Sequence, residues 1–292
     1  MVKKILITGI NGFLGSHLAK MLCDKYEIIG LTNNKNNLHR INSFNFKIYS
    51  SKDSLEEIFQ ENIFFSIIHA ATVYRRSDED RLDSLINTNV LLPIKLIQLA
   101  NHNDVKLFIN TDTFFNTPSV KHDYLQDYTL SKKNALEWLV LISNDVKKCK
   151  LVNLKIFHMY GNEDSITKFI PSIVSKINNK EAHISLTKGE QTRDFIYIDD
   201  VVAAYAIVLN NIDKLELFTE FEVGTGIETS IRSLVSLMVK ISKNNITKLK
   251  FGEIQYKNNE IMQSKANNLK LCELGWEINY NLEKGLMNLF SQ

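Results

Sequence analysis

The segment from Gly9 to Gly15 constrains the fold of this chain more than any other stretch of its sequence. Three glycines stand there at the spacing G-x-x-G-x-x-G, between a short apolar run and a segment with helical apolar spacing. The first glycine permits a tight strand-to-helix turn, the second lets the backbone approach a phosphate, and the third lets helix and strand pack closely. Free N–H groups and the helix dipole attract the phosphate charge. The turn predicts a dinucleotide site rather than a turn without ligand, with these cradle residues: Gly9, Asn11, Gly12, Phe13, Leu14 and Gly15.

Strand-like apolar runs alternate with amphipathic helical segments over the first half of the chain. The strand-like runs are 4–8, 27–31, 64–69, 105–110 and 151–157, and the helical segments include 80–100 and 128–143. Apolar strands separated by helices build a parallel sheet that is covered on both faces. We therefore expect an α/β fold, with a Rossmann-type doubly wound parallel sheet and a smaller C-terminal α/β substrate-binding domain. The expected domain ranges are 1–161 plus about 197–226 for the first, and about 162–196 plus 227–292 for the second.

Composition and charge exclude several classes of protein. Lys and Arg number 35 against 33 Asp and Glu, so the net charge of +2 creates no field that attracts nucleic acid or an anionic membrane. The longest apolar runs break within about ten residues, short of the roughly 20 that span a bilayer. Gly9 and Gly12 interrupt the amino-terminal apolar stretch and no small-residue cleavage site follows, so no signal peptide is expected. The cysteines and histidines lack disulfide or metal-ligand spacing, which predicts a cytoplasmic protein without a metal site.

The end of the second strand-like run indicates which dinucleotide is bound. A carboxylate there accepts a hydrogen bond from the 2′-hydroxyl of NAD, whereas a basic residue suits the 2′-phosphate of NADP. The run continues into Thr32, Asn33 and Lys35, and residues 28–35 contain no carboxylate. These residues favour NADPH over NADH, with a plain polar turn as the alternative.

Tyr128 and Lys132 place a phenol and an amine four residues apart, on one face of an expected helix. A lysine beside a tyrosine favours the phenolate, so the pKa of the phenol is expected to fall and the residue to exchange protons near neutral pH. Thr111 follows an apolar run, at the carboxyl end of a parallel strand where this fold binds ligands. The same spacing recurs at Tyr280 and Lys284, but no such strand lies near it and a structural role is expected there.

Together, the glycine turn, Thr111 and the Tyr128–Lys132 pair resemble the extended short-chain dehydrogenase/reductase family, the NAD(P)-dependent epimerases, dehydratases and reductases of nucleotide sugars. Further matching segments lie at 69–72, 89–90, 157–161, 189–201, 223–226 and 274–276. The resemblance implies catalytic roles. Thr111 would hydrogen-bond the C4 oxygen of a sugar, Tyr128 would exchange its proton, and Lys132 would hold the nicotinamide ribose. It also implies cofactor contacts by Ala70, Ala71, Thr72 and Asn89, and substrate contacts by Thr113, His158, Lys168 and Arg193.

Each implied substrate contact has a structural alternative. Arg193 would bind the substrate diphosphate through its fork-shaped cation, and the alternative is a surface ion pair with Asp194. His158 stands where the family usually has asparagine, and it either contacts the substrate or packs as a structural histidine. Lys168 would reach the nucleotide or remain solvated.

Within the family, the chain is similar to CDP-abequose synthase-like sugar-nucleotide 4-ketoreductases at 107–115, 190–200 and 258–262. The resemblance implies NADPH-dependent reduction of a CDP- or dTDP-linked 6-deoxy or 3,6-dideoxy hexos-4-ulose for surface polysaccharide (O-antigen). Thr113 stands where family dehydratases carry a glutamate, so dehydration is not expected. An NAD-dependent 4-epimerase is the alternative, and a non-catalytic NADP-binding redox sensor is a lesser one. The family also implies a homodimer through Trp138 and the segment 80–100, with packing inside one chain as the alternative.

Overall fold

The computed structural model of the chain describes residues 2–74, 82–117, 122–146 and 148–291. The chain forms two compact units, each assembled from three separate stretches of sequence. Unit 1 comprises Met1–Asn116, Tyr124–Lys155 and Val202–Phe221, and unit 2 comprises Thr117–Asp123, Ile156–Val201 and Glu222–Gln292.

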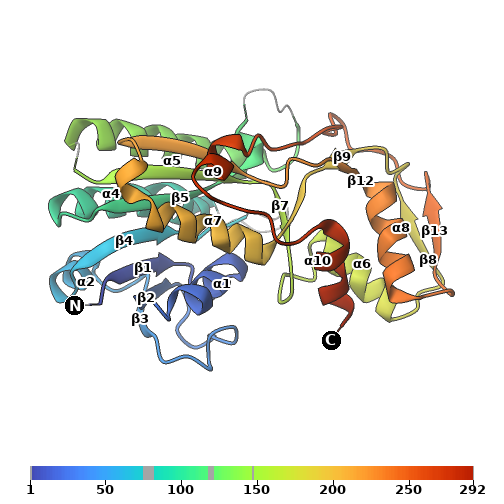
Figure 1. Cartoon of the computed structure of the whole chain (residues 1–292), viewed down its shortest axis with the longest axis horizontal. Coiled ribbons are helices and arrows are strands. Elements are labelled where there is room, and N and C mark those ends of the chain that lie inside the picture. Colours follow the sequence, from blue (N-terminus) through green and yellow to red (C-terminus); the bar gives the residue numbers. More distant parts are fainter. Residues whose placement is uncertain (1, 75–81, 118–121, 147, 292) are drawn as a thin grey trace. The chain divides into compact units, whose positions relative to one another are not determined.

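Unit 1 is built on a seven-stranded sheet with the order β11-β6-β5-β4-β1-β2-β3. Figure 1 labels its strands β1 to β5. Its strands are β1 Lys4–Thr8, β2 Glu27–Thr32, β3 Lys47–Ser50, β4 Phe64–His69, β5 Leu107–Thr113, β6 Lys150–Ile156 and β11 Phe218–Val223. The five strands from β5 to β3 pair in parallel. Ile5, Leu6 and Ile7 of β1 are fully buried, because helices cover both faces of a parallel sheet. The doubly wound Rossmann-type sheet that the sequence predicts is confirmed.

Helices pack on both faces of this sheet. They are α1 Phe13–Leu22, α2 Leu55–Glu61, α3 Leu82–Ile86, α4 Leu92–His102, α5 Gln126–Val146 and α7 Ile198–Asn210, with the short turns η1 Asn87–Leu91, η2 Phe114–Asn116 and η3 Ile212–Lys214. On one face, Leu6 and Phe108 of the sheet belong to the same core cluster as Leu96 of α4 and Leu139 of α5. Nearer the start of α5, Lys132 Nζ donates to the carbonyl of Thr111 at 2.9 Å, which ties this helix to the end of β5.

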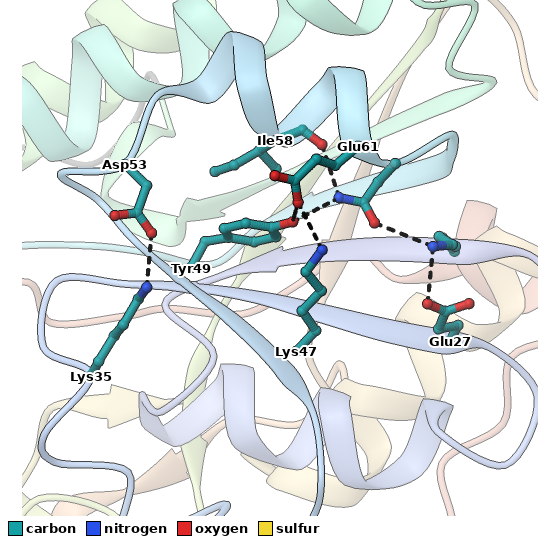
Figure 2. Close-up of polar contacts among 9 residues, drawn as sticks. Glu27, Lys35, Lys47, Tyr49, Asp53, Ile58 and Glu61 are labelled. Atoms are coloured by element: carbon teal, nitrogen blue, oxygen red, sulfur yellow. Dashed lines mark hydrogen bonds and ion pairs between the residues drawn. The ribbon is translucent and has the colours of Figure 1, made fainter.

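The edge strand β3 is joined to α2 by a polar network that Figure 2 shows. Lys47 Nζ lies 2.8 Å from Glu61 Oε2, and the hydroxyl of Tyr49 donates to the same oxygen at 2.5 Å. Asn62 Nδ2 donates to the Tyr49 hydroxyl at 3.0 Å. Charged side chains on an edge strand oppose pairing with another chain. This network therefore protects the free edge of the sheet at β3.

Unit 2 combines helices with three two-stranded sheets. Its elements are α6 Phe169–Asn178, α8 Ile231–Ser242, α9 Leu269–Glu273, α10 Leu282–Phe290, β7 His158–Tyr160, β8 His183–Leu186, β9 Thr192–Arg193, β10 Phe195–Tyr197, β12 Thr229–Ser230 and β13 Lys248–Phe251. β7 pairs with β10 and β8 with β13 in parallel, whereas β9 and β12 are antiparallel. Across the part of the chain that the structure describes, no helix is both long and apolar enough to cross a membrane.

Candidate active site

The turn between β1 and α1 has the geometry that the glycine spacing predicts. Gly9 has a φ of +68°, and a Cβ atom there would lie 2.8 Å from the Cα of Ala71. The N–H of Gly12 donates to the carbonyl of Gly9 at 2.7 Å. Gly12 is the N-cap of α1, and its position supplies no side-chain cap to the described part of this helix. The N–H groups of the first turn are therefore available to an anion. The turn therefore fits the pyrophosphate of a dinucleotide.

The predicted cofactor segment 70–72 follows β4 and is fixed beside this turn. The N–H of Ala71 donates to Thr8 Oγ1 at 3.1 Å, and the same hydroxyl lies 2.9 Å from His69 Nδ1. Burial and the charge of Lys132 hold the pKa of His69 well below its usual range. A neutral histidine that bridges β4 to β1 thus anchors the segment.

Asn11 ties the glycine turn to the loop after β2. Its Nδ2 donates to the carbonyl of Asn37 at 2.9 Å, and its Oδ1 accepts the N–H of Arg40 at 3.1 Å. Nη1 of Arg40 in turn donates to the carbonyl of Asn11 at 3.1 Å. The Asn11 side chain is therefore engaged by the protein and positions the loop that carries Lys35. The sequence patterns did not single out Arg40, because no local spacing links it to the turn.

Lys35, the predicted reader of the 2′-phosphate, has a carboxylate partner. Its Nζ lies 2.8 Å from Oδ2 of Asp53, and the two side chains are 43% and 38% exposed (Figure 2). The hydrogen bond from Lys35, together with one from the N–H of Ser50, holds the pKa of Asp53 below its usual range. Exposed pairs of this kind are weak, so a phosphate could replace the carboxylate beside Lys35. Thr32, at the end of β2, is buried, and Asn33 is exposed.

Asn89 lies in the π-helical turn η1, and its side chain is fully buried. Its Oδ1 accepts the N–H of Val73 at 2.8 Å, and its Nδ2 donates to the carbonyl of Val73 at 2.9 Å and to Ser131 Oγ at 3.0 Å. The amide thereby joins the segment after β4 to α5. These bonds engage both polar atoms of the side-chain amide. A direct contact of Asn89 with the cofactor stays a prediction.

Tyr128 and Lys132 share one face of α5, and they are only 5% and 3% exposed. Lys132 Nζ donates to the carbonyl of Thr111 at 2.9 Å, and the hydroxyl of Thr111 lies 2.7 Å from that of Tyr205 in α7. Of the two threonines at the end of β5, Thr113 is the one that affects the Tyr128 phenol, whose pKa it lowers. The structure therefore brings Lys132 to Thr111 at the end of β5 and bonds the Thr111 hydroxyl to Tyr205.

The surroundings of Tyr128 keep its phenol protonated. Burial raises the pKa of Tyr128 well above its usual value, and Tyr74 and Asp112 raise it further, whereas Thr113 lowers it. Burial also lowers the pKa of Lys132 to about 8, an effect that the charge of Asp112 opposes. The direction for Tyr128 is opposite to the one expected from the sequence, because the phenol is buried and the amine is directed at the Thr111 carbonyl. A phenol in this state is protonated at neutral pH and holds its proton more tightly than an ordinary tyrosine does.

Tyr74 is a residue of this site that the sequence patterns did not identify as functional. Its ring stacks on that of Tyr128, with centroids 4.4 Å apart and planes at 29°. Tyr74 also raises the pKa of the Tyr128 phenol. Tyr74 lies in an irregular segment after β4, so no periodic pattern could have connected it to α5.

Asp112 is buried beside these residues, and both of its oxygens are engaged. Oδ2 accepts Nδ2 of Asn153 and Nδ2 of Asn116, each at 3.0 Å, and Oδ1 accepts the N–H of Thr113 at 2.8 Å. Burial raises the pKa of Asp112, and these three bonds oppose the shift. The carboxylate therefore acts on its neighbours through its charge rather than as an acid directed at a ligand.

In unit 2, Arg193 has a carboxylate partner other than its sequence neighbour. Its Nη2 lies 2.6 Å from Glu260 Oε1, and its Nη1 donates to the carbonyl of Ile261 at 2.5 Å. Asp194, the partner considered from the sequence, accepts the N–H of Thr225 at 2.7 Å instead. Because the guanidinium is almost fully buried, a diphosphate would have to share or replace Glu260.

The two other predicted substrate residues also lie in unit 2. Burial and the charge of Arg193 lower the pKa of His158 to about 3, so this histidine is neutral at physiological pH. Lys168 Nζ lies 3.0 Å from Asp164 Oδ1, and Lys168 is the N-cap of α6. The contacts of both residues with a substrate stay predictions.

Comparison with known proteins identifies the family. Residues 5–224 match the model of the NAD dependent epimerase/dehydratase family. A CDP-abequose synthase of Salmonella typhimurium is 33% identical to this chain over 99% of the chain and 97% of its own length. One of Yersinia pseudotuberculosis is 24% identical over 89% of the chain and 90% of its own length.

Solved structures share the fold. A UDP-glucose 4-epimerase with UDP-glucose from Thermotoga maritima has a TM-score of 0.83 at 23% identity, over 98% of this chain and 97% of that one. A UDP-glucuronic acid 4-epimerase from Bacillus cereus, in complex with UDP-glucuronic acid and NAD, has a TM-score of 0.82 at 22% identity, over 98% of each chain. The resemblance drawn from the motifs is confirmed, and the chain belongs to the NAD dependent epimerase/dehydratase family of enzymes.

Proposed function

We propose that the protein uses NADPH to reduce the 4-keto group of a nucleotide-linked sugar, a CDP- or dTDP-bound 6-deoxy or 3,6-dideoxy hexos-4-ulose. The observation that carries the proposal is the buried pair of Tyr128 and Lys132 on one face of α5, with the Lys132 amine bonded to the end of β5. Such a phenol gives a proton to a carbonyl oxygen as the carbon gains a hydride. The relatives named CDP-abequose synthase support a CDP-linked sugar.

The chain has the residues to hold the dinucleotide. The glycine turn takes the pyrophosphate, the segment 70–72 lies beside it, and Lys35 takes the 2′-phosphate where the end of β2 has no carboxylate. When bound, the cofactor supplies the hydride. A relative from Bacillus cereus holds NAD, which supports a nicotinamide cofactor, and the preference for NADPH depends on Thr32 and Lys35.

Each polar group at the end of β5 has a role in the reduction. The hydroxyl of Thr111 binds the substrate oxygen, Tyr128 gives that oxygen its proton, and the Lys132 ammonium stabilises the phenolate left behind. Thr113, which lowers the pKa of the phenol, orients it. Arg193, His158 and Lys168 of unit 2 bind the nucleotide diphosphate and the sugar.

The site lacks the features of two related reactions. Dehydration requires a second acid, and Thr113 stands at its position, while both oxygens of Asp112 are engaged by donors of the protein. A 4-epimerase retains its cofactor as NAD, and a carboxylate at the end of β2 would favour that form. Epimerisation remains the second candidate, because two of the solved structures that share the fold are named as 4-epimerases.

The test follows NADPH absorbance with a panel of 4-keto-6-deoxy and 4-keto-3,6-dideoxy nucleotide sugars, for the wild type and Tyr128→Phe. We expect one CDP- or dTDP-linked ketone to oxidise NADPH stoichiometrically and the substitution to lower the rate by at least about 10²-fold. Interconversion of 4-hydroxyl epimers with copurified NAD, and no loss of NADPH, would establish the epimerase instead. Binding of NADP with neither activity would indicate a redox sensor.

We further propose a cytoplasmic homodimer that supplies a deoxyhexose for surface polysaccharide. Free thiols at Cys23, Cys149 and Cys272 agree with a reducing compartment. Trp138 and Leu141 of α5 are about half exposed, and α5 packs beside α4. Exposed apolar side chains on adjacent helices favour association with a second copy of the same surface.

A further inference from the structure

A row of polar side chains crosses three neighbouring strands of the sheet in unit 1. Asn153 of β6 is fully buried between Asp112 of β5 and Glu220 of β11. Its Nδ2 donates to Oδ2 of Asp112 at 3.0 Å and to Oε2 of Glu220 at 2.7 Å. Its Oδ1 accepts Nδ2 of Asn110 at 2.7 Å. One buried amide therefore joins two carboxylates, and both of its polar atoms are engaged.

The two carboxylates fix the direction of the Asn153 amide. Each hydrogen of its amino group serves one carboxylate, whereas in the reversed direction the amide oxygen would face both of them. A buried carboxylate that lacks donors is strongly unfavourable. At the far end of the row, Glu220 Oε1 lies 2.9 Å from Nζ of the buried Lys155. The charge of Glu220 is thus already balanced, and the amide keeps a single orientation.

At the near end of the row, Asp112 fixes the backbone at the end of β5. Its Oδ1 accepts the N–H of Thr113 at 2.8 Å, and its Oδ2 accepts Nδ2 of Asn116 at 3.0 Å. Thr111 immediately precedes it, and the carbonyl of Thr111 accepts Nζ of Lys132 at 2.9 Å. A displaced Asp112 would therefore move the peptide group to which the Lys132 amine is bonded.

We propose that Asn153 is a positioning residue of the active site, which holds the Asp112 carboxylate as a fixed anion next to the peptide group that anchors the Lys132 amine. The inference rests on the proposed reduction for its catalytic consequence. The directions of two pKa shifts agree with it. The hydrogen bond from Asn153 is the largest effect that opposes the rise in the pKa of Asp112 on burial. The charge of Asp112 in turn raises the pKa of Lys132.

Other titratable side chains near Asp112 and Lys132 do not balance the charge of the amine. They come from β4 and the segment after it, from α5 and α7, and from the ion pair at the far end of the row: His69, Tyr74, Tyr128, Tyr205, Lys155 and Glu220. Burial lowers the pKa of His69 and raises those of Tyr128 and Tyr205, so these three are neutral at pH 7. Within the described part of the site, Asp112 is the carboxylate that compensates Lys132.

The first test measures the pKa of Lys132 without turnover. The full chain, labelled with an NMR-active carbon at the ε position of lysine, is titrated as wild type and Asn153→Leu, and Lys132→Met assigns the resonance. We expect Asn153→Leu to lower the pKa of Lys132 by about one unit, because Asp112 without this donor takes up a proton and no longer balances the amine. An unchanged pKa of Lys132 would overturn the proposal.

Asn62→Leu is the matched control, because it removes a buried amide of unit 1 outside the site. Asn62 is 3% exposed, and its Nδ2 donates to the carbonyl of Ile58 at 2.9 Å and to the hydroxyl of Tyr49 at 3.0 Å. This variant should leave the pKa of Lys132 at about 8.

Asn116→Ala decides the matter if Asn153→Leu does not fold. Asn116 is only half-buried, and it supplies another of the three donors to Asp112. Its loss should lower the pKa of Lys132 in the same direction, and no change in this folded variant would show that the donors of Asp112 do not control the amine.

The second test measures the pH dependence of turnover. We expect the pH above which kcat/KM falls to move from about 8 in the wild type to about 7 in Asn153→Leu, so that kcat/KM at pH 8 is lowered about fivefold. A residue that only fills the core would change the stability of the protein and leave this pH where it is.

The two tests separate failure of this inference from failure of the proposed reduction. If the wild type oxidises NADPH with no ketone, the reductase is wrong, while the lysine titration still decides whether Asn153 acts on Lys132. If the wild type is an active reductase and Asn153→Leu behaves as Asn62→Leu does in both tests, Asn153 serves only the packing of the sheet.

Discussion

Lys132 holds a positive charge in a place where burial disfavours it. Its pKa is lowered to about 8, so the amine is charged at pH 7 and loses its proton as the pH rises through about 8. Since the ammonium stabilises the phenolate that Tyr128 becomes, we expect kcat/KM to be constant toward lower pH and to fall above about pH 8, as the pH profile of the initial rate can measure. Lys133→Met is the matched control, because the neighbouring Lys133 is exposed. A profile that continues to rise above pH 9 would contradict the assignment.

The same burial predicts that Lys132→Met stabilises the fold. Below pH 8 the lysine is charged in both the folded and the unfolded protein. The folded protein then bears the full energetic cost of a buried charge. The penalty decreases between pH 8 and 10.5 and is absent above, because the amine is then neutral in both states. We expect a gain of about 2 kcal/mol in the free energy of unfolding at pH 7, after loss of the hydrogen bond to Thr111, and no gain above pH 10.5. Urea denaturation at the two pH values measures it, and a loss at pH 7 would show that the hydrogen bond dominates.

Residues joined by a local spacing could be predicted from the sequence, whereas residues joined only by the fold could not. Tyr128 and Lys132 are four positions apart on one helix, so periodicity alone places them together. Tyr74, Tyr205 and Glu260 contact site residues that are distant in the chain. Their positions depend on strand order and loop path, which a sequence pattern does not encode.

The turn between β1 and α1 depends on glycine for two separable reasons. Gly9 has a positive φ, and a Cβ there would lie 2.8 Å from the Cα of Ala71. Gly252 has a φ of +91°, and no atom of the described residues lies within 4 Å of its Cβ position, so Gly252→Ala measures the effect of the backbone alone. We expect Gly9→Ala to destabilise unit 1 by about 2 kcal/mol more than the control and to abolish NADPH binding. Thermal unfolding and NADPH fluorescence test this, and equal effects of the two variants would contradict it.

The loop after β2 carries the preference between the two dinucleotides. We expect Lys35→Ala to raise the KM for NADPH by at least about tenfold and to leave that for NADH unchanged, because only NADPH has the 2′-phosphate. Lys47→Ala is the control, since Lys47 pairs with Glu61 at the edge strand. Both ion pairs are visible in Figure 2. An equal loss with both cofactors would mean that Lys35 supports the loop rather than reading the phosphate.

Apolar runs in the sequence predicted strands correctly. The interruption of a helix by polar contacts could not be predicted in the same way. The runs 4–8 and 64–69 are β1 and β4. The single helix expected over 80–100 is instead divided into α3, η1 and α4, with residues 80 and 81 outside the described part of the chain. The π-helical turn occurs where Asn89 bonds Val73 and Ser131, a cause that lies outside the helix. The edge strand β3 was not predicted, because it has only four residues and none is fully buried.

The proposed homodimer is a property of the whole molecule that one substitution can test. Trp138 is 52% exposed on α5, and burying such a side chain at the centre of an interface is worth about 2 kcal/mol or more. We expect the wild type to be a dimer by light scattering and Trp138→Glu to be a monomer at the same concentration. Ile63→Glu is the control, because Ile63 is 86% exposed in the loop between α2 and β4. A monomeric wild type, or a dimeric Trp138→Glu, would refute the proposed interface.

The strand order sets the sequence of events while the chain is being synthesised. Strands β1 to β6 are complete at residue 156, but the neighbour that covers β6 is β11, at Phe218–Val223. The intervening residues belong largely to unit 2, which itself ends only at the last residues of the chain. During synthesis, β6 therefore has an unpaired edge until β11 has been made. Neither unit can finish folding before part of the other unit has been synthesised. Chaperones that bind exposed strands have their opportunity in this interval, and a product truncated after β6 is expected to aggregate rather than fold.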